Sequence, residues 1–124
     1  MTEQLGPLSG QISRDTVRIL SEYSGRGPTK AKTAIGGDVV TVVVADALTP
    51  AEQTVAEGGE AEVVLAQRHA LQRAMRDELT AMVERHTKRK VIAFMSDNHI
   101  DPDMAIEAFV LDSPAGPSAN GASG

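Results

Sequence analysis

The segment Tyr23-Ser24-Gly25-Arg26-Gly27-Pro28 joins an amphipathic stretch to the most strand-like stretch of the chain. Glycine readily adopts the positive φ that often ends a helix, and Pro28 lacks the N–H that a continuing helix needs. We therefore predict a helix that begins near Ser9 and ends at or just before Gly25. Its buried face is predicted from the residues at helical spacing, which are Ile12, Thr16, Ile19, Leu20 and Tyr23.

The stretch that follows this turn contains the strongest strand signal, Asp38-Val39-Val40-Thr41-Val42-Val43-Val44. Its β-branched residues point to both faces, which indicates a strand covered by helix on one side and by a different partner on the other. A second subunit would serve as that partner. Residues 29–37, which carry Lys30 and Lys32 and close with Gly36-Gly37, are assigned no strand.

Two helices are predicted next. Leu48-Thr49-Pro50-Ala51-Glu52 is typical of a helix start, because Thr49 can cap, proline suits the first helical position and Glu52 completes a capping box. This short helix is expected to run to about Ala56 and to break at Gly58-Gly59.

A long helix is predicted from about Glu60 to His86, because apolar residues recur there at spacings of seven, four, four and three. Those residues are Val64, Leu71, Met75, Leu79 and Met82. The charged residues of the helix are interpreted as a solvated face of mixed sign. They are Arg68, Arg73, Arg76, Asp77, Glu84 and Arg85.

The C-terminal part predicts a hairpin of strands 91–95 and 104–111 around a turn from Asp97 to Asp103. The order α-β-α-α-β-β then predicts an α+β, two-layer domain with a three-stranded sheet and helices packed on one face. We expect a flexible lead-in over 1–8, a single domain over 9–112 and a disordered tail over 113–124, where Pro, Gly, Ser and Ala dominate.

Composition limits the functions open to this chain of 124 residues. A net charge of −5 argues against general nucleic-acid binding, which depends on clustered Lys and Arg. No apolar run is long enough to span a bilayer, and no signal peptide is evident. The absence of cysteine fits a reducing compartment, so we expect a cytoplasmic protein. Three aromatic residues make a small core, and a homodimer would help to stabilise it.

The turn at residues 25–28 has two interpretations. Its glycines let backbone N–H groups approach a small anion, which Arg26 with Lys30 or Lys32 would hold. Alternatively, the turn is only a helix stop followed by a proline-stiffened loop. The candidate ligand- or partner-binding residues are Tyr23, Gly25, Arg26, Gly27, Lys30 and Lys32.

Metal and catalytic sites have little support. His69 and His86 lie about 25 Å apart if their helix is continuous, at 1.5 Å per residue. They therefore cannot bind the same metal ion within one chain. The acids of 97–103 around His99 lack the glycine and glutamate of an EF-hand. No nucleophile motif surrounds the serines, and Thr49 is better used as a cap. We expect no metal and no cofactor, and we favour a non-enzymatic protein.

With these segments assembled, the chain resembles the family named after the MpsC component of a Na+-translocating, membrane potential-generating system, earlier catalogued as a domain of unknown function. The likeness covers about Gln11 to Leu111. Its specific parts are two motifs typical of the family, E-[YF]-x-G-[RK]-G-P and L-T-x-x-E, which stand here as Glu22–Pro28 and Leu48–Glu52. The chain departs from the family in its Ala, Pro and Gly-rich ends and at Gly58-Gly59.

The resemblance implies a cytoplasmic accessory or regulatory subunit of a membrane system that transports ions or inorganic carbon, and it supplies no catalytic residues. The alternative is a free-standing protein that binds a small anion or a nucleotide at the Gly25-Arg26-Gly27-Pro28 turn. A hydrolase or transferase with an unrecognised site is a third option.

Overall fold

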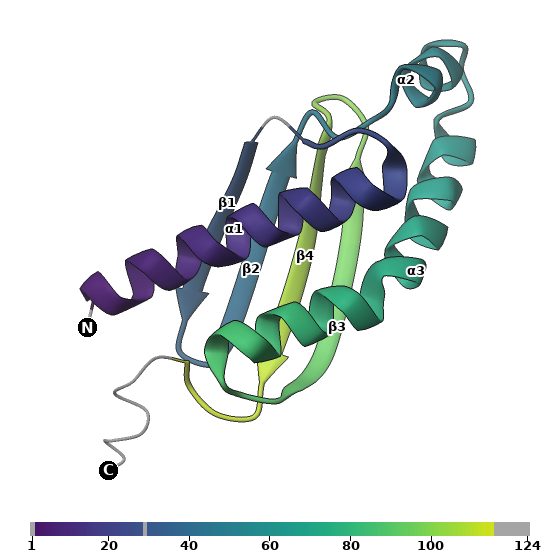
Figure 1. The fold of residues 1–124 in the computed structure, drawn as a ribbon. Coiled ribbons are helices and arrows are strands. Elements are labelled where there is room, and N and C mark those ends of the chain that lie inside the picture. Colours follow the sequence, from purple (N-terminus) through teal and green to yellow (C-terminus); the bar gives the residue numbers. More distant parts are fainter. Residues whose placement is uncertain (1, 29, 116–124) are drawn as a thin grey trace.

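A computed structural model describes residues 2–28 and 30–115, which form a helical layer on one side of a β-sheet. The long helices α1 (Thr2–Ser24) and α3 (Ala61–Thr87) both lie on the same face of the sheet, and the short α2 (Pro50–Glu57) stands at one end (Figure 1). The α+β architecture with helices on one face is therefore confirmed.

The sheet has four antiparallel strands in the order β1-β2-β4-β3, so the predicted three-stranded sheet and the predicted order of elements are wrong. The central pair, β2 and β4, comes from segments that are far apart in the sequence and are joined through α2, α3 and β3. The strands are β1 (Lys30–Gly36), β2 (Val39–Ala45), β3 (Val91–His99) and β4 (Met104–Leu111).

The strand that the sequence did not predict is β1. It forms a two-residue hairpin with β2, in which Gly36 pairs with Val39 and Gly37 has a φ of 59°. Two-residue hairpin turns need a positive φ at their first loop position, and glycine adopts this φ readily. β1 is rich in Lys, Ala and Gly, which are depleted in strands, and it lies at the sheet edge, where it has a single neighbouring strand. Its pairing to β2 therefore outweighs its weak local preference.

Three predicted boundaries also change. Helix α1 begins at Thr2, so residues 2–8, expected as a loose lead-in, are helical even across Pro7. Strand β3 extends four residues beyond the predicted end and includes part of the expected turn. At the start of the expected tail, the N–H of Ala115 donates to the carbonyl of Gly37 at 3.0 Å, and Ala115 is buried. The rest of that tail, 116–124, lies outside the described residues.

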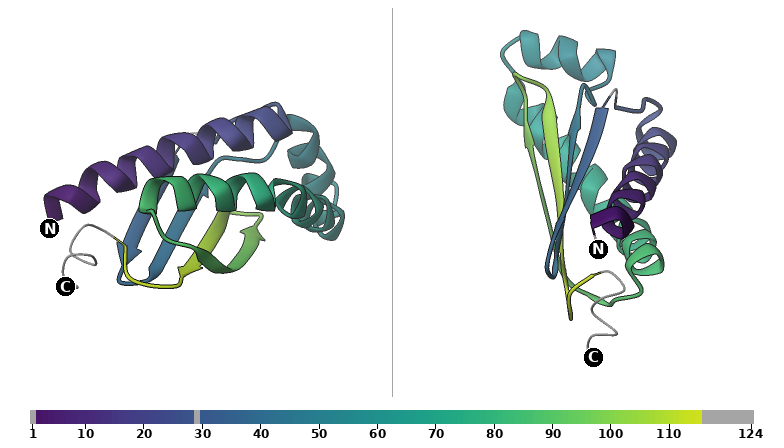
Figure 2. Two further views of the ribbon diagram at one scale, coloured as in Figure 1. Left: turned by 60° about the horizontal axis from the view of Figure 1, so that its bottom comes forward. Right: turned by 90° about the vertical axis from the view of Figure 1, so that its left-hand side faces the viewer.

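The core lies between the sheet and the two long helices. Ile12, Ile19 and Leu20 of α1 belong to one buried cluster with alternate residues of β2, and the ring centroids of Phe94 and Phe109 lie 5.2 Å apart. Seen from the side, α1 and the C-terminal half of α3 lie on one side of the sheet, and no described segment covers the opposite face (Figure 2). We call this uncovered side the open face.

Candidate functional site

We call Glu22–Pro28 and Leu48–Glu52 the first and second signature segments. The first one ends helix α1 as predicted. α1 stops at Ser24, Gly25 has a φ of 79°, and its N–H donates to the carbonyl of Ser21 at 2.9 Å. The Ser24 hydroxyl lies 2.8 Å from the carbonyl of Leu20 and 2.7 Å from that of Arg26. These contacts fix the direction in which the chain leaves the helix.

Arg26 lies against the connection between β2 and α2. Its Nη2 donates to the backbone carbonyl of Asp46 at 3.3 Å. Its Nε is buried and has no acceptor among residues 2–28 and 30–115. The same connection is held from the other side by Asp103, whose carboxylate accepts from the N–H of Leu48 at 2.9 Å. Arg26 thus ties the turn to the segment that precedes α2.

The other two candidate cations, Lys30 and Lys32, are exposed and alternate along β1 with residues that face the helices. Ala31 and Ile35 pack against the core, and the hydroxyl of Thr33 bonds that of Ser13 at 2.7 Å. Both lysines therefore extend from the open face, whereas Arg26 is engaged at the β2–α2 connection. An anion site shared by the three cations stays a prediction.

The second signature segment forms the predicted capping box at the start of α2. The Thr49 hydroxyl accepts from the N–H of Glu52 at 3.1 Å, and the Glu52 carboxylate accepts from the N–H of Thr49 at 2.9 Å. Glu52 is buried, at 4% exposure, and the same carboxylate oxygen accepts from Nη1 of Arg68 at 3.2 Å, which compensates the burial of its charge. The cap and a buried ion pair therefore share one carboxylate.

The two signature segments meet at a cavity of about 360 Å³ between α1, α2 and α3. At its rim, the hydroxyl of Tyr23 donates to Oε1 of Glu78 at 3.0 Å, a bond to the carboxylate that raises the pKa of Tyr23. Residues about twenty positions apart in the sequence are thus brought to one cavity. The cavity is lined by Tyr23, Ser24, Thr49, Glu52, Gln67, Ala70 and Leu71.

Beneath this cavity, buried polar residues continue along α3 toward the sheet. Gln72 donates through Nε2 to Oε2 of Glu107 at 3.0 Å, and Nδ2 of Asn98 donates to Oε1 of Gln72 at 2.8 Å. Glu107 is 1% exposed, and its Oε1 has no partner among the described residues. Burial raises the pKa of Glu107 to about 7, although the bond from Gln72 and the charge of Arg68 oppose the rise.

Arg68 corrects the prediction that the charged residues of α3 form a solvated face. It is 2% exposed, and Gln72 is buried equally. The sequence does contain the signal, since Val64, Arg68, Gln72 and Met75 are spaced by four, four and three residues and so share one helical face. Arg68 and Gln72 interrupt an otherwise apolar stripe, and a buried partner had to exist for each.

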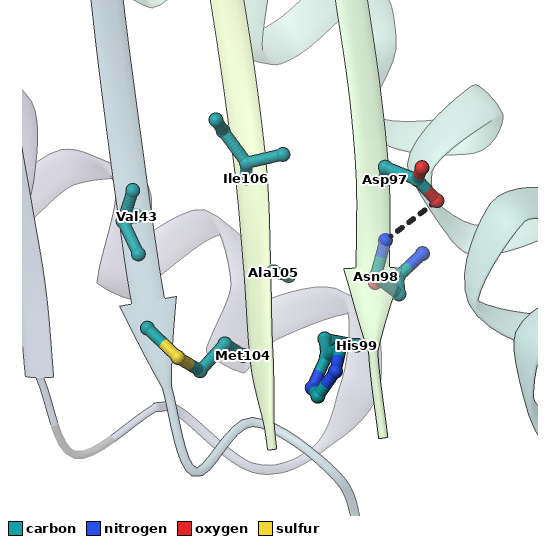
Figure 3. Close-up of a pocket in the computed structure, with 7 residues that line it drawn as sticks. All are labelled: Val43, Asp97, Asn98, His99, Met104, Ala105 and Ile106. Carbon is teal, nitrogen blue, oxygen red and sulfur yellow. Dashed lines mark hydrogen bonds between the residues drawn. The ribbon is translucent and has the colours of Figure 1, made fainter. Parts of the chain in front are cut away.

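A second hollow lies on the open face and has a volume of about 370 Å³ (Figure 3). Val43, Met104 and Ile106 supply its apolar wall, and Asp97 and His99 stand at its edge on β3. The Asp97 carboxylate accepts from the N–H of Asn98 at 2.8 Å and lies 3.1 Å from Nε2 of His69, and these bonds lower the pKa of Asp97. The open face therefore carries an apolar centre and a carboxylate at one edge.

The polar groups of the signature segments are used in structural contacts. Ser24 and Thr49 bond backbone groups, and Glu52 pairs with Arg68. Within the described part of the chain, no three acidic or histidine side chains gather in a way that could hold a metal ion. Within the same residues, no helix has the length and apolar character needed to cross a bilayer.

A family model described as "Na+-translocating membrane potential-generating system (MpsC)" matches residues 4–113. No curated protein and no solved structure matches the chain.

Proposed function

The chain belongs to the MpsC family, and from this premise we propose that it is a non-enzymatic accessory or regulatory subunit of a system that translocates Na+ and generates a membrane potential. We propose further that it acts on the cytoplasmic side as a homodimer. The family description supports the connection with the membrane system. The apolar open face supports a role in which the chain binds another protein.

The observation that carries the proposal is the open face. Monomeric proteins rarely expose a large contiguous apolar patch, and such patches commonly mark interaction sites. Four large apolar side chains of this face are 37–55% exposed: Val39, Met95, Met104 and Ile106. In contrast, the polar groups of the signature segments brace α1, α2 and α3 against one another. This division favours a rigid binding module over an enzyme.

The test is a measurement of membrane potential in cells that lack this gene. We expect a smaller Na+-dependent potential in the presence of a protonophore, and restoration by the wild-type chain. Ile106→Asp, which charges the centre of the open face, should fail to restore it. Val63→Asp is the matched control, because Val63 is 50% exposed on α3, away from that face. An unchanged potential in the deletion strain would refute the proposal.

A second function, small-anion binding, is favoured by one observation. The buried Nε of Arg26 has no acceptor within residues 2–28 and 30–115, and it lies beside a glycine turn. Such a donor suits bicarbonate or phosphate. Thermal unfolding with bicarbonate, phosphate and nucleotides should then show a rise for the wild type that Arg26→Ala lacks. No rise in either protein would exclude this function.

A further inference from the structure

Side chains on the open face form rows that cross the four strands at one level. The pairing of strands fixes each row, since a residue of β1 lies beside one of β2, then one of β4, then one of β3. One row is Lys32, Val43, Ile106 and Asp97. It begins with a cation at the β1 edge, has two apolar residues at its centre and ends with an anion at the β3 edge.

We infer that the open face binds a second copy of the chain, with a two-fold axis that runs parallel to the strands between β2 and β4. This inference rests on the homodimer proposed above and not on the transport role. Rotation by 180° about that axis reverses the order of the strands and keeps each residue at its level. Lys32 then lies opposite Asp97 of the partner subunit, and Val43 lies opposite Ile106 of the partner subunit.

The ion pair suits this arrangement. Lys32 is exposed, and the Asp97 side chain is 74% exposed although its carboxylate also lies 3.1 Å from Nε2 of His69. The lowered pKa of Asp97 keeps this carboxylate charged near neutral pH. Sheets that pack face to face are rotated by about 30°, which displaces the edge strands by a few ångströms. The flexible stem of lysine can span such a displacement. Each dimer contains this pair twice, once at each edge.

The sizes of the side chains agree with the same axis. In the row next to the charged one, Ala34 and Met95 occupy the two edges, so each methionine meets the small alanine of the partner. In the row on the other side, Ala45 and Met104 occupy the two central strands and meet in the same way. Large residues opposite small ones let two sheets interdigitate.

The competing two-fold arrangements fit less well. An in-plane axis perpendicular to the strands would place β1 over β1 of the other copy and so bring lysines near lysines. Edge-to-edge pairing through β1 is disfavoured because this edge strand carries Lys30 and Lys32, and lysine on an edge strand opposes such pairing. Charge and size therefore select one arrangement and one occupant.

Charge reversal of the full-length chain tests the pair. Sedimentation should show that Lys32→Glu and Asp97→Lys each raise the Kd of the dimer about tenfold, because each changes two ion pairs per dimer. The double variant should recover most of the affinity, since it rebuilds both pairs with the signs exchanged. Arg73→Glu, an equal change of charge at an exposed site on α3, should leave the Kd unchanged.

A substitution at the centre of the open face tests whether this face forms the dimer interface. Ile106→Asp should raise the Kd about a hundredfold or more, because two carboxylates would be buried at the axis, and Val63→Asp should have no such effect. Thermal unfolding checks that each variant is folded. A wild-type chain that stays monomeric at high micromolar concentration would overturn the inference and leave the open face to another partner. A dimer in which the two charge reversals weaken binding independently, with no recovery, would overturn the proposed axis.

Discussion

Replacement of Glu107 by glutamine should change how stability depends on pH. Glu107 lies on β4 beneath α3, accepts one hydrogen bond from Gln72 and is 1% exposed. Burial raises its pKa, and the charge of Arg68 acts on it in the opposite direction. Glutamine keeps the size of the side chain and an oxygen that Gln72 can bond, but it cannot ionise.

The magnitude follows from the pKa. Burial raises the pKa of Glu107 from its ordinary value of 4.5 to about 7. Between these values the folded chain holds a proton that the unfolded chain has lost, so the free energy of unfolding falls as the pH rises. At about 1.4 kcal/mol per pKa unit, the loss amounts to roughly 3 kcal/mol. Stability from this group is therefore full below pH 4.5, declines up to pH 7 and is constant above it.

Urea unfolding at a series of pH values measures this effect. The free energy of unfolding of Glu107→Gln, minus that of the wild type, should grow by roughly 3 kcal/mol between pH 4.5 and pH 7. Glu57→Gln is the control, since Glu57 is exposed at the end of α2 and should give a constant difference. A difference that is equally constant for Glu107→Gln would show that this carboxyl does not titrate near neutrality, and the argument from burial would fail.

Three further substitutions test the junction of the helices. Arg68→Ala should lower the free energy of unfolding by about 3–5 kcal/mol in urea titration, because it leaves the buried carboxylate of Glu52 without its counter-charge. A loss below about 1 kcal/mol would contradict the importance of this buried pair. Thr49→Ala should cost about 1 kcal/mol through loss of the cap, and a cost no larger than that of Thr54→Ala, within α2, would contradict it. Gly25→Ala should destabilise the protein by about 1 kcal/mol, because the φ of 79° at this position is unfavourable for alanine. Gly10→Ala, inside α1, should stabilise the protein by a similar amount. Calorimetry should therefore show that the two melting temperatures move in opposite directions.

Most of the fold follows from local signals. The stop at Gly25, the capping box of Thr49 and Glu52 and the long helix α3 were each predicted within one residue or so of their observed bounds. Strand β1 was not, because its Lys and Ala residues have little strand preference and its pairing with β2 supplies the stabilisation. Without β1, the number of strands was wrong.

The site was predicted less completely. The two signature segments were identified, but nothing in their spacing shows that they line one cavity. Arg68 was assigned to a solvated surface because charged residues are mostly exposed, although its helical spacing places it on the buried stripe. Glu107 had no signal, since a glutamate on a strand gives no indication of which face is covered.

The sequence by itself determined where helices start and stop, which strand is strongest and which two segments form the signature. Those features depend on residues within a few positions of one another, through caps, turns and periodicity. Only the tertiary structure decided that β2 and β4 are the central strands and that Arg68 and Glu107 are buried. These outcomes depend on contacts between residues far apart in the chain, whose cost in loop closure and gain in burial are properties of the whole fold.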